Sequence, residues 1–129
     1  DAALSTLITD LRDRRRLDRT LIVLMGEFGR GGNGKADRDD VRENRGHWAR
    51  ACSTVLFGGG IQGGSIIGRT DHCAGTVQDR LVTIADYFAT ICTILGIDYM
   101  RENPSPGGRP VPIVVDAQRT RPNVIQEIL

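Results

Sequence analysis

The hydrophobic positions of this chain fall into a few short segments with different spacings. Near the start they recur every three or four residues, at Leu4, Leu7, Ile8 and Leu11. This spacing predicts an amphipathic helix over residues 2–15. Residues 20–25 then read Thr-Leu-Ile-Val-Leu-Met, with no polar residue after the threonine. Such a continuous apolar run is typical of a strand buried on both faces of a parallel sheet.

Further along, the pattern predicts more strands and a second helix. Residues 51–57 form a second apolar segment that three glycines end, and Ile66–Ile67 indicates a short strand. Thr83 and Asp86 have the spacing of a capping box, which predicts a helix start there. Gly96 is expected to end this helix. One face of it is expected to be apolar, lined by Ile84, Phe88, Ile91, Cys92 and Leu95.

Two stretches lack such patterns. Residues 26–46 are a long polar loop rich in Gly, Asp, Arg and Asn, and residues 101–129 are a proline- and glycine-rich tail with one short strand expected at 113–115. The order of elements predicts an α/β layer fold, with residues 1–129 belonging to one domain. Two or three strands make a thin sheet, and Asp1 opens directly into helical sequence without a signal peptide. We therefore expect a C-terminal segment of a larger α/β domain.

Composition narrows the classes of partner. The 129 residues carry a net charge of +1, which gives no reason to expect a nucleic-acid or membrane surface. No apolar run is long enough to cross a bilayer. The three cysteines are widely spaced and include no C-x-x-C, so neither a disulfide framework nor a zinc finger is expected.

Residues 29–35, Gly-Arg-Gly-Gly-Asn-Gly-Lys, fit the phosphate-binding pattern G-x-x-x-x-G-K. The context argues against it. Ala36 stands where the Ser or Thr that binds magnesium is needed, and acidic residues follow where a helix should begin. A nucleotide-binding module is therefore the least favoured hypothesis, and unchanged nucleotide affinity in Lys35→Ala would eliminate it.

Three other side chains are better candidates for a site. Glu27 and Arg30 follow the first strand closely, at the edge of an α/β sheet where ligands bind. His47 lies at the far end of the polar loop, which can bring it back to Glu27; carboxylate and imidazole together suit a divalent metal. The Arg30 guanidinium can bind an oxyanion. His72, beside Asp71, is a second histidine candidate. Each of these also has a plain interpretation as a surface or loop residue.

Several segments, in this order, resemble one known family. They are "LDRTLIVLMGEFGR", "GHW", "STVLFGGGIQGGSIIGRTD", "DRLVTIADYFATICTILGID" and "GGRPVPIV". Together they are similar to the C-terminal part of the uncharacterised, secreted sulfatase-like proteins of the alkaline phosphatase superfamily. The resemblance covers nearly the whole chain. It implies an α/β sandwich with a mostly parallel central sheet, of which this chain would be the C-terminal portion only.

The resemblance also implies a function. The protein would be a metal-dependent hydrolase of phosphate or sulfate esters, carried on small molecules or glycans, in the periplasm or outside the cell. Glu27 and His47 would bind a divalent metal (zinc, calcium or manganese), and Arg30 would add positive charge around the transition state. The nucleophile would come from the N-terminal remainder of the same protein.

Two departures from the family pattern favour an alternative. Gly46 stands where the family usually has Asp, and Phe28 stands where relatives carry a metal-binding His. The alternative is a non-catalytic binding or structural domain that keeps the fold with a degraded metal site.

Overall fold

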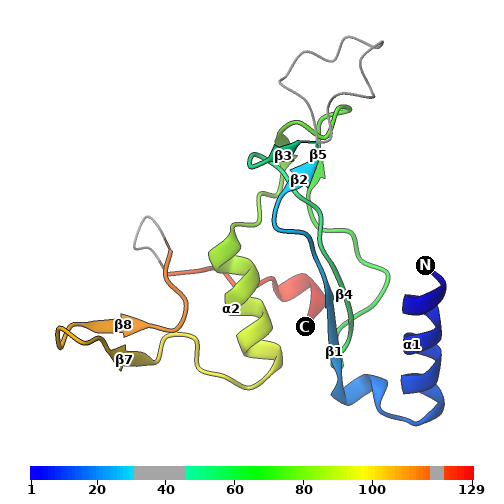
Figure 1. The fold of residues 1–129 in the computed structure, drawn as a ribbon, viewed down its shortest axis with the longest axis horizontal. Helices are drawn as coiled ribbons and strands as arrows, with labels where there is room; N and C mark the ends of the chain where they lie inside the picture. The colour runs from blue at the N-terminus through cyan, green and yellow to red at the C-terminus, as the bar shows by residue number, and fades with distance from the viewer. Residues whose placement is uncertain (31–45, 117–120) are drawn as a thin grey trace. The chain divides into compact units, whose positions relative to one another are not determined.

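The computed structural model describes residues 1–30, 46–116 and 121–129. Figure 1 shows the elements in chain order. They are α1 (Ala2–Asp13), η1 (Leu17–Arg19), β1 (Leu21–Leu24), β2 (Gly29–Arg30), β3 (His47–Trp48), β4 (Val55–Gly58), β5 (Arg69–Thr70), β6 (Val77–Asp79), α2 (Ile84–Ile94), β7 (Glu102–Pro104), β8 (Pro110–Pro112) and η2 (Gln126–Ile128). In the described part of the chain, no helix is long and apolar enough to cross a membrane.

The predicted parallel sheet is wrong. Every sheet among the described residues has two strands, in the pairs β1–β4, β2–β3, β5–β6 and β7–β8, and the pairing is antiparallel. The described residues therefore form neither a central parallel sheet nor a sandwich built on one. Val23 and Leu24 are 37% and 49% exposed, so β1 is not covered on both faces as its apolar run predicted.

The contacts within the chain define two compact units. Unit 1 comprises Asp1–Leu21, Gly58–Ser65 and Val82–Leu129, and unit 2 comprises Ile22–Phe57 and Ile66–Leu81. The expectation of one domain over residues 1–129 stays a prediction.

Unit 1 contains both α-helices. The helix expected over residues 2–15 is observed as α1, and α2 begins and ends where its signals predicted. The Thr83 hydroxyl accepts from Asp86 N (3.1 Å) while Thr83 N donates to the Asp86 carboxylate (3.0 Å), which confirms the capping box. Gly96 follows the helix in the left-handed conformation (φ 70°), as the helix-ending signal predicted.

The predicted apolar face of α2 is largely wrong. Ile84 is 75% exposed, Phe88 44% and Leu95 56%, whereas Asp86 and Thr90 are buried. The polar residues are buried because they bind backbone from the end of the chain: Asp86 Oδ1 accepts from Asn123 N (2.6 Å) and Thr90 Oγ1 accepts from Ile125 N (2.9 Å). A small apolar cluster of Ala85, Cys92 and Val114, with Tyr99 against it, completes the core.

One of three predicted short strands is observed. The strand expected at 51–57 is observed as β4, which begins at Val55. The strands expected at Ile66–Ile67 and at 113–115 are wrong, since no strand is assigned there and the neighbouring β5 and β8 lie at Arg69–Thr70 and Pro110–Pro112. β8 pairs with β7, so the tail expected to be irregular contains a two-stranded sheet.

Candidate functional site

The two strands β2 and β3 set the positions of the candidate site residues in unit 2. They pair antiparallel with Arg30 opposite His47 and Gly29 opposite Trp48. Gly29 allows this arrangement because a Cβ there would lie 1.7 Å from the carbonyl oxygen of Ala51. Gly29 is thus a strand residue in close contact with backbone. The rest of the G-x-x-x-x-G-K match, residues 31–35, and most of the polar loop of residues 26–46 lie outside the described residues.

Glu27, Arg30 and His47 meet at one carboxylate oxygen. Glu27 Oε1 lies 2.9 Å from His47 Nε2 and accepts from Arg30 Nη2 at 3.0 Å. All three side chains are slightly more than half exposed. The pKa of Glu27 is held below its usual range, first by a hydrogen bond from its own backbone and then by the Arg30 charge, so the carboxylate is ionised at neutral pH. The structure therefore brings together the three residues that the sequence singled out.

Aromatic contacts hold the histidine side of this cluster. The Phe28 ring stacks on the His47 ring, with centroids 5.0 Å apart and planes at 26°. The Trp48 indole N–H donates to the carbonyl of Gly75 at 2.6 Å, and the Arg50 guanidinium lies over the Trp48 ring. β3 is thus tied to the loop of residues 71–76. The sequence offered no signal for the Phe28–His47 stack, because ring stacking depends on the β2–β3 pairing.

Asp71 organises that loop. Its carboxylate accepts from the backbone N–H groups of Cys73 (3.1 Å), Gly75 (2.8 Å) and Thr76 (2.9 Å) and from the Thr76 hydroxyl (2.7 Å). These bonds, the Thr76 hydroxyl first, hold the pKa of Asp71 below its usual range. His72 is exposed in this turn, and Asp71 uses its carboxylate on the loop backbone. The carboxylate therefore has a structural role in the turn.

A hollow of about 250 Å³ opens beside Arg30, within unit 2. The residues that line it are Phe28, Gly29, Arg30, Ala51, Cys52, Ser53, Thr70 and Ala74. Arg30 is thus shared between the carboxylate cluster and this hollow.

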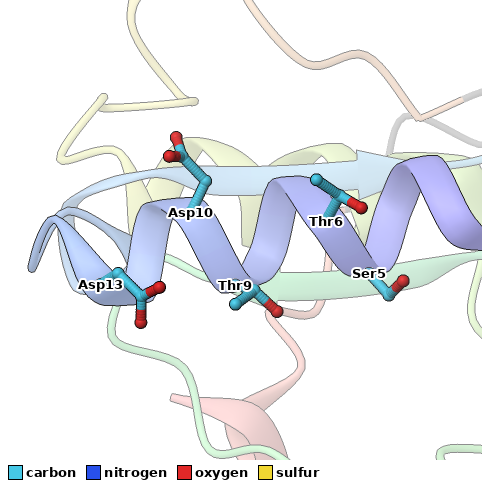
Figure 2. A pocket seen from close by; sticks show the side chains of 5 residues that line it. All are labelled: Ser5, Thr6, Thr9, Asp10 and Asp13. Atoms are coloured by element: carbon cyan, nitrogen blue, oxygen red, sulfur yellow. The ribbon is translucent and has the colours of Figure 1, made fainter.

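A second hollow, of about 360 Å³, follows the polar side of α1 (Figure 2). Its lining projects from that one helix and comprises Ser5, Thr6, Thr9, Asp10 and Asp13. The Ser5 and Thr6 hydroxyls both donate to the carbonyl of Ala2, and Asp10 accepts from Arg14. These groups bond within their own helix, so this surface is a solvated helix face.

The described residues provide an incomplete metal-ligand set. They contain no group of three or more His, Cys, Asp and Glu side chains that can hold a metal ion. Glu27 and His47 provide two donors, whereas a catalytic zinc site uses three protein ligands. Any further ligands would have to come from outside the described residues.

A family model matches residues 1–129, the whole length of the chain. The chain belongs to the family described as "Protein of unknown function (DUF1501)". No curated protein and no solved structure matches it. The family description carries no activity, so the function rests on the geometry of the site.

Proposed function

We propose that this DUF1501 chain is part of an exported, metal-dependent phosphate- or sulfate-ester hydrolase-like protein, in which Glu27 and His47 are two ligands of one divalent metal. The observation that supports the proposal is the 2.9 Å separation of Glu27 Oε1 and His47 Nε2 across the β2–β3 pair. The further ligands and the nucleophile would come from the remainder of the protein.

The donor pair fits a metal in its spacing. Two ligands of a tetrahedral zinc, each about 2.0–2.1 Å from the ion, lie about 3.3 Å apart. The observed 2.9 Å requires these side chains to separate by only a few tenths of an ångström. The mixed nitrogen and oxygen donors favour zinc or manganese over calcium, which takes oxygen ligands.

The neighbouring side chains fit the same role. The Phe28 ring restricts the His47 imidazole, and ligand orientation of this kind supports metal affinity. When bound, a metal would supply Lewis-acid stabilisation of the ester oxygens. A hydrogen bond from the Glu27 backbone and then the Arg30 charge hold the Glu27 carboxylate in its charged form, and Arg30 has further N–H groups for an ester oxyanion.

The chain contains one tryptophan, Trp48, directly after His47, which provides a local signal for metal binding. Zinc or manganese added to the full-length protein should change Trp48 emission saturably, and calcium should not.

Glu27→Gln and His47→Gln should each weaken the binding at least about 100-fold, since loss of an outer partner alone costs 10–100-fold. His72→Gln is the matched control and should bind as the parent protein does. Binding that is unaffected by Glu27→Gln and His47→Gln would refute the assignment. Hydrolysis of 4-nitrophenyl phosphate and sulfate by the same protein tests the reaction class.

A second candidate, a non-catalytic domain, has one observation in its favour. A single Glu27 oxygen already binds both Arg30 in β2 and His47 in β3, and such a shared contact can hold two strands together without any catalytic role. If the full-length protein takes up no metal and hydrolyses neither ester, this structural role is the correct function of these residues.

A further inference from the structure

We infer that the hollow beside Arg30 binds a tetrahedral oxyanion, phosphate or sulfate, carried on a small apolar group. Of the described residues that line it, Arg30 is the charged one, and the Ser53 and Thr70 hydroxyls and the Cys52 thiol add polar groups. A guanidinium with hydroxyl groups around it is a set that recognises such an anion. This inference rests on the proposed function for its place next to a reacting ester, but the pocket itself can be tested without metal.

The Arg30 side chain is held where it can serve the pocket. Within the described residues it uses one N–H, from Nη2, on Glu27, and the other four of its five N–H groups are there for a ligand. Because the contact with Glu27 already restricts the Arg30 side chain, less rotamer entropy is lost when a ligand binds. The Glu27 carboxylate also opposes part of the Arg30 charge, because the two form an ion pair at 3.0 Å. We therefore expect millimolar affinity.

The walls of the pocket are held by backbone contacts. Gly29 lies directly against the Ala51 carbonyl, so these two lining residues are in close backbone contact. Ala74, another lining residue, has a left-handed backbone (φ 54°), and its N–H donates to the Asp71 carbonyl (3.1 Å) in the loop that the Asp71 carboxylate holds. A volume of about 250 Å³ is below the usual range of drug-sized sites, roughly 300–1,000 Å³, and suits a small ligand. Phe28 is 42% exposed and provides an apolar contact for the group that carries the anion.

The cysteines provide a test with an internal control. Cys52 lines the pocket, Cys73 is exposed but does not line it, and Cys92 is buried. Alkylation of the full-length protein by iodoacetamide, in the presence of a metal chelator, is followed at each cysteine by mass spectrometry. Sulfate or phosphate at ten times its Kd should slow Cys52 alkylation about tenfold relative to chloride of equal ionic strength, and Cys73 should be unaffected. Phenylphosphonate should protect Cys52 at lower concentration than inorganic phosphate, because its ring can contact Phe28.

Three variants separate this inference from the proposed metal site. Arg30→Met should abolish the protection of Cys52, while Arg50→Met, which removes a nearby arginine outside the pocket, should retain it. Glu27→Gln should weaken metal binding yet strengthen oxyanion protection, because the Arg30 charge is no longer opposed. Protection in a protein that binds no metal would refute the proposed function and leave the pocket standing. No protection of Cys52 by any of the three anions, or equal slowing of Cys52 and Cys73, would overturn the inference.

Discussion

Replacing the buried hydroxyl of Thr90 with a methyl group, in Thr90→Val, should lower the free energy of unfolding by about 2 kcal/mol. Thr90 is 0% exposed, and its hydroxyl donates to the Asp86 carbonyl (2.7 Å) and accepts from Ile125 N (2.9 Å). Valine has nearly the same shape, so the variant tests the hydrogen bonds and not the packing. Ile125 is 4% exposed, and its N–H would be left without an acceptor; a buried unsatisfied group of this kind costs about 1–3 kcal/mol.

Thermal unfolding followed by circular dichroism measures this cost. At roughly 4 °C per kcal/mol for a chain of this size, the midpoint should fall by about 8 °C. Thr93→Val is the matched control. Among the described residues, the Thr93 hydroxyl bonds only to the Ala89 carbonyl in its own helix (2.8 Å), so this substitution should cost no more than about 0.5 kcal/mol. Hydrogen exchange at the Ile125 amide should speed up in Thr90→Val and not in Thr93→Val. Equal midpoints for the two variants would refute the role assigned to Thr90.

Two further predictions concern unit 2. Gly29→Ala should destabilise this unit by about 1–3 kcal/mol, because the new methyl group meets the Ala51 carbonyl. Gly46→Ala is the control and should change the stability by less than about 0.5 kcal/mol, because a Cβ there meets no described atom within 4 Å. Urea unfolding followed by tryptophan fluorescence compares the two variants, and similar midpoints would contradict the close contact at Gly29. Asp71 has a lowered folded-state pKa, so its stabilisation of the loop should be complete above the unfolded value of about 3.9 and be lost as the pH falls through the folded value. The amide resonance of Thr76 should report this acid transition, and Asp71→Asn should abolish it; a transition that persists in the variant would assign it to another group.

The local signals in the sequence predicted the helices well. The Thr83–Asp86 capping box and Gly96 depend on contacts between residues close in sequence, so the ends of α2 could be predicted from the local sequence. Its buried face could not, because Asp86 and Thr90 are buried by bonds to backbone 37 and 35 residues away. A face assigned by hydrophobicity alone cannot include such polar contacts.

The sheet was mispredicted for a related reason. A continuous apolar run indicates a strand, but the number of its neighbours depends on strands elsewhere in the chain. β1 pairs with β4 and with no further strand of the described residues, so Val23 and Leu24 stay partly exposed.

The candidate site was partly predictable. Glu27 and His47 were expected to meet because the polar loop returns the chain to the first strand, and the structure places their side chains in contact. The shared use of one Glu27 oxygen by Arg30 and His47 was not foreseen, since it depends on the β2–β3 register. Asp71 was considered as a partner for His72, whereas its carboxylate accepts hydrogen bonds from the backbone N–H groups of its own loop.

The most direct test of the metal proposal is anomalous diffraction at the zinc edge from crystals of the zinc-loaded full-length protein. We expect a single strong peak about 2.0–2.2 Å from both Glu27 Oε1 and His47 Nε2, with those two atoms moved slightly apart from their 2.9 Å contact. A zinc peak elsewhere, with the Glu27–His47 contact intact, would contradict the assignment of these residues as metal ligands.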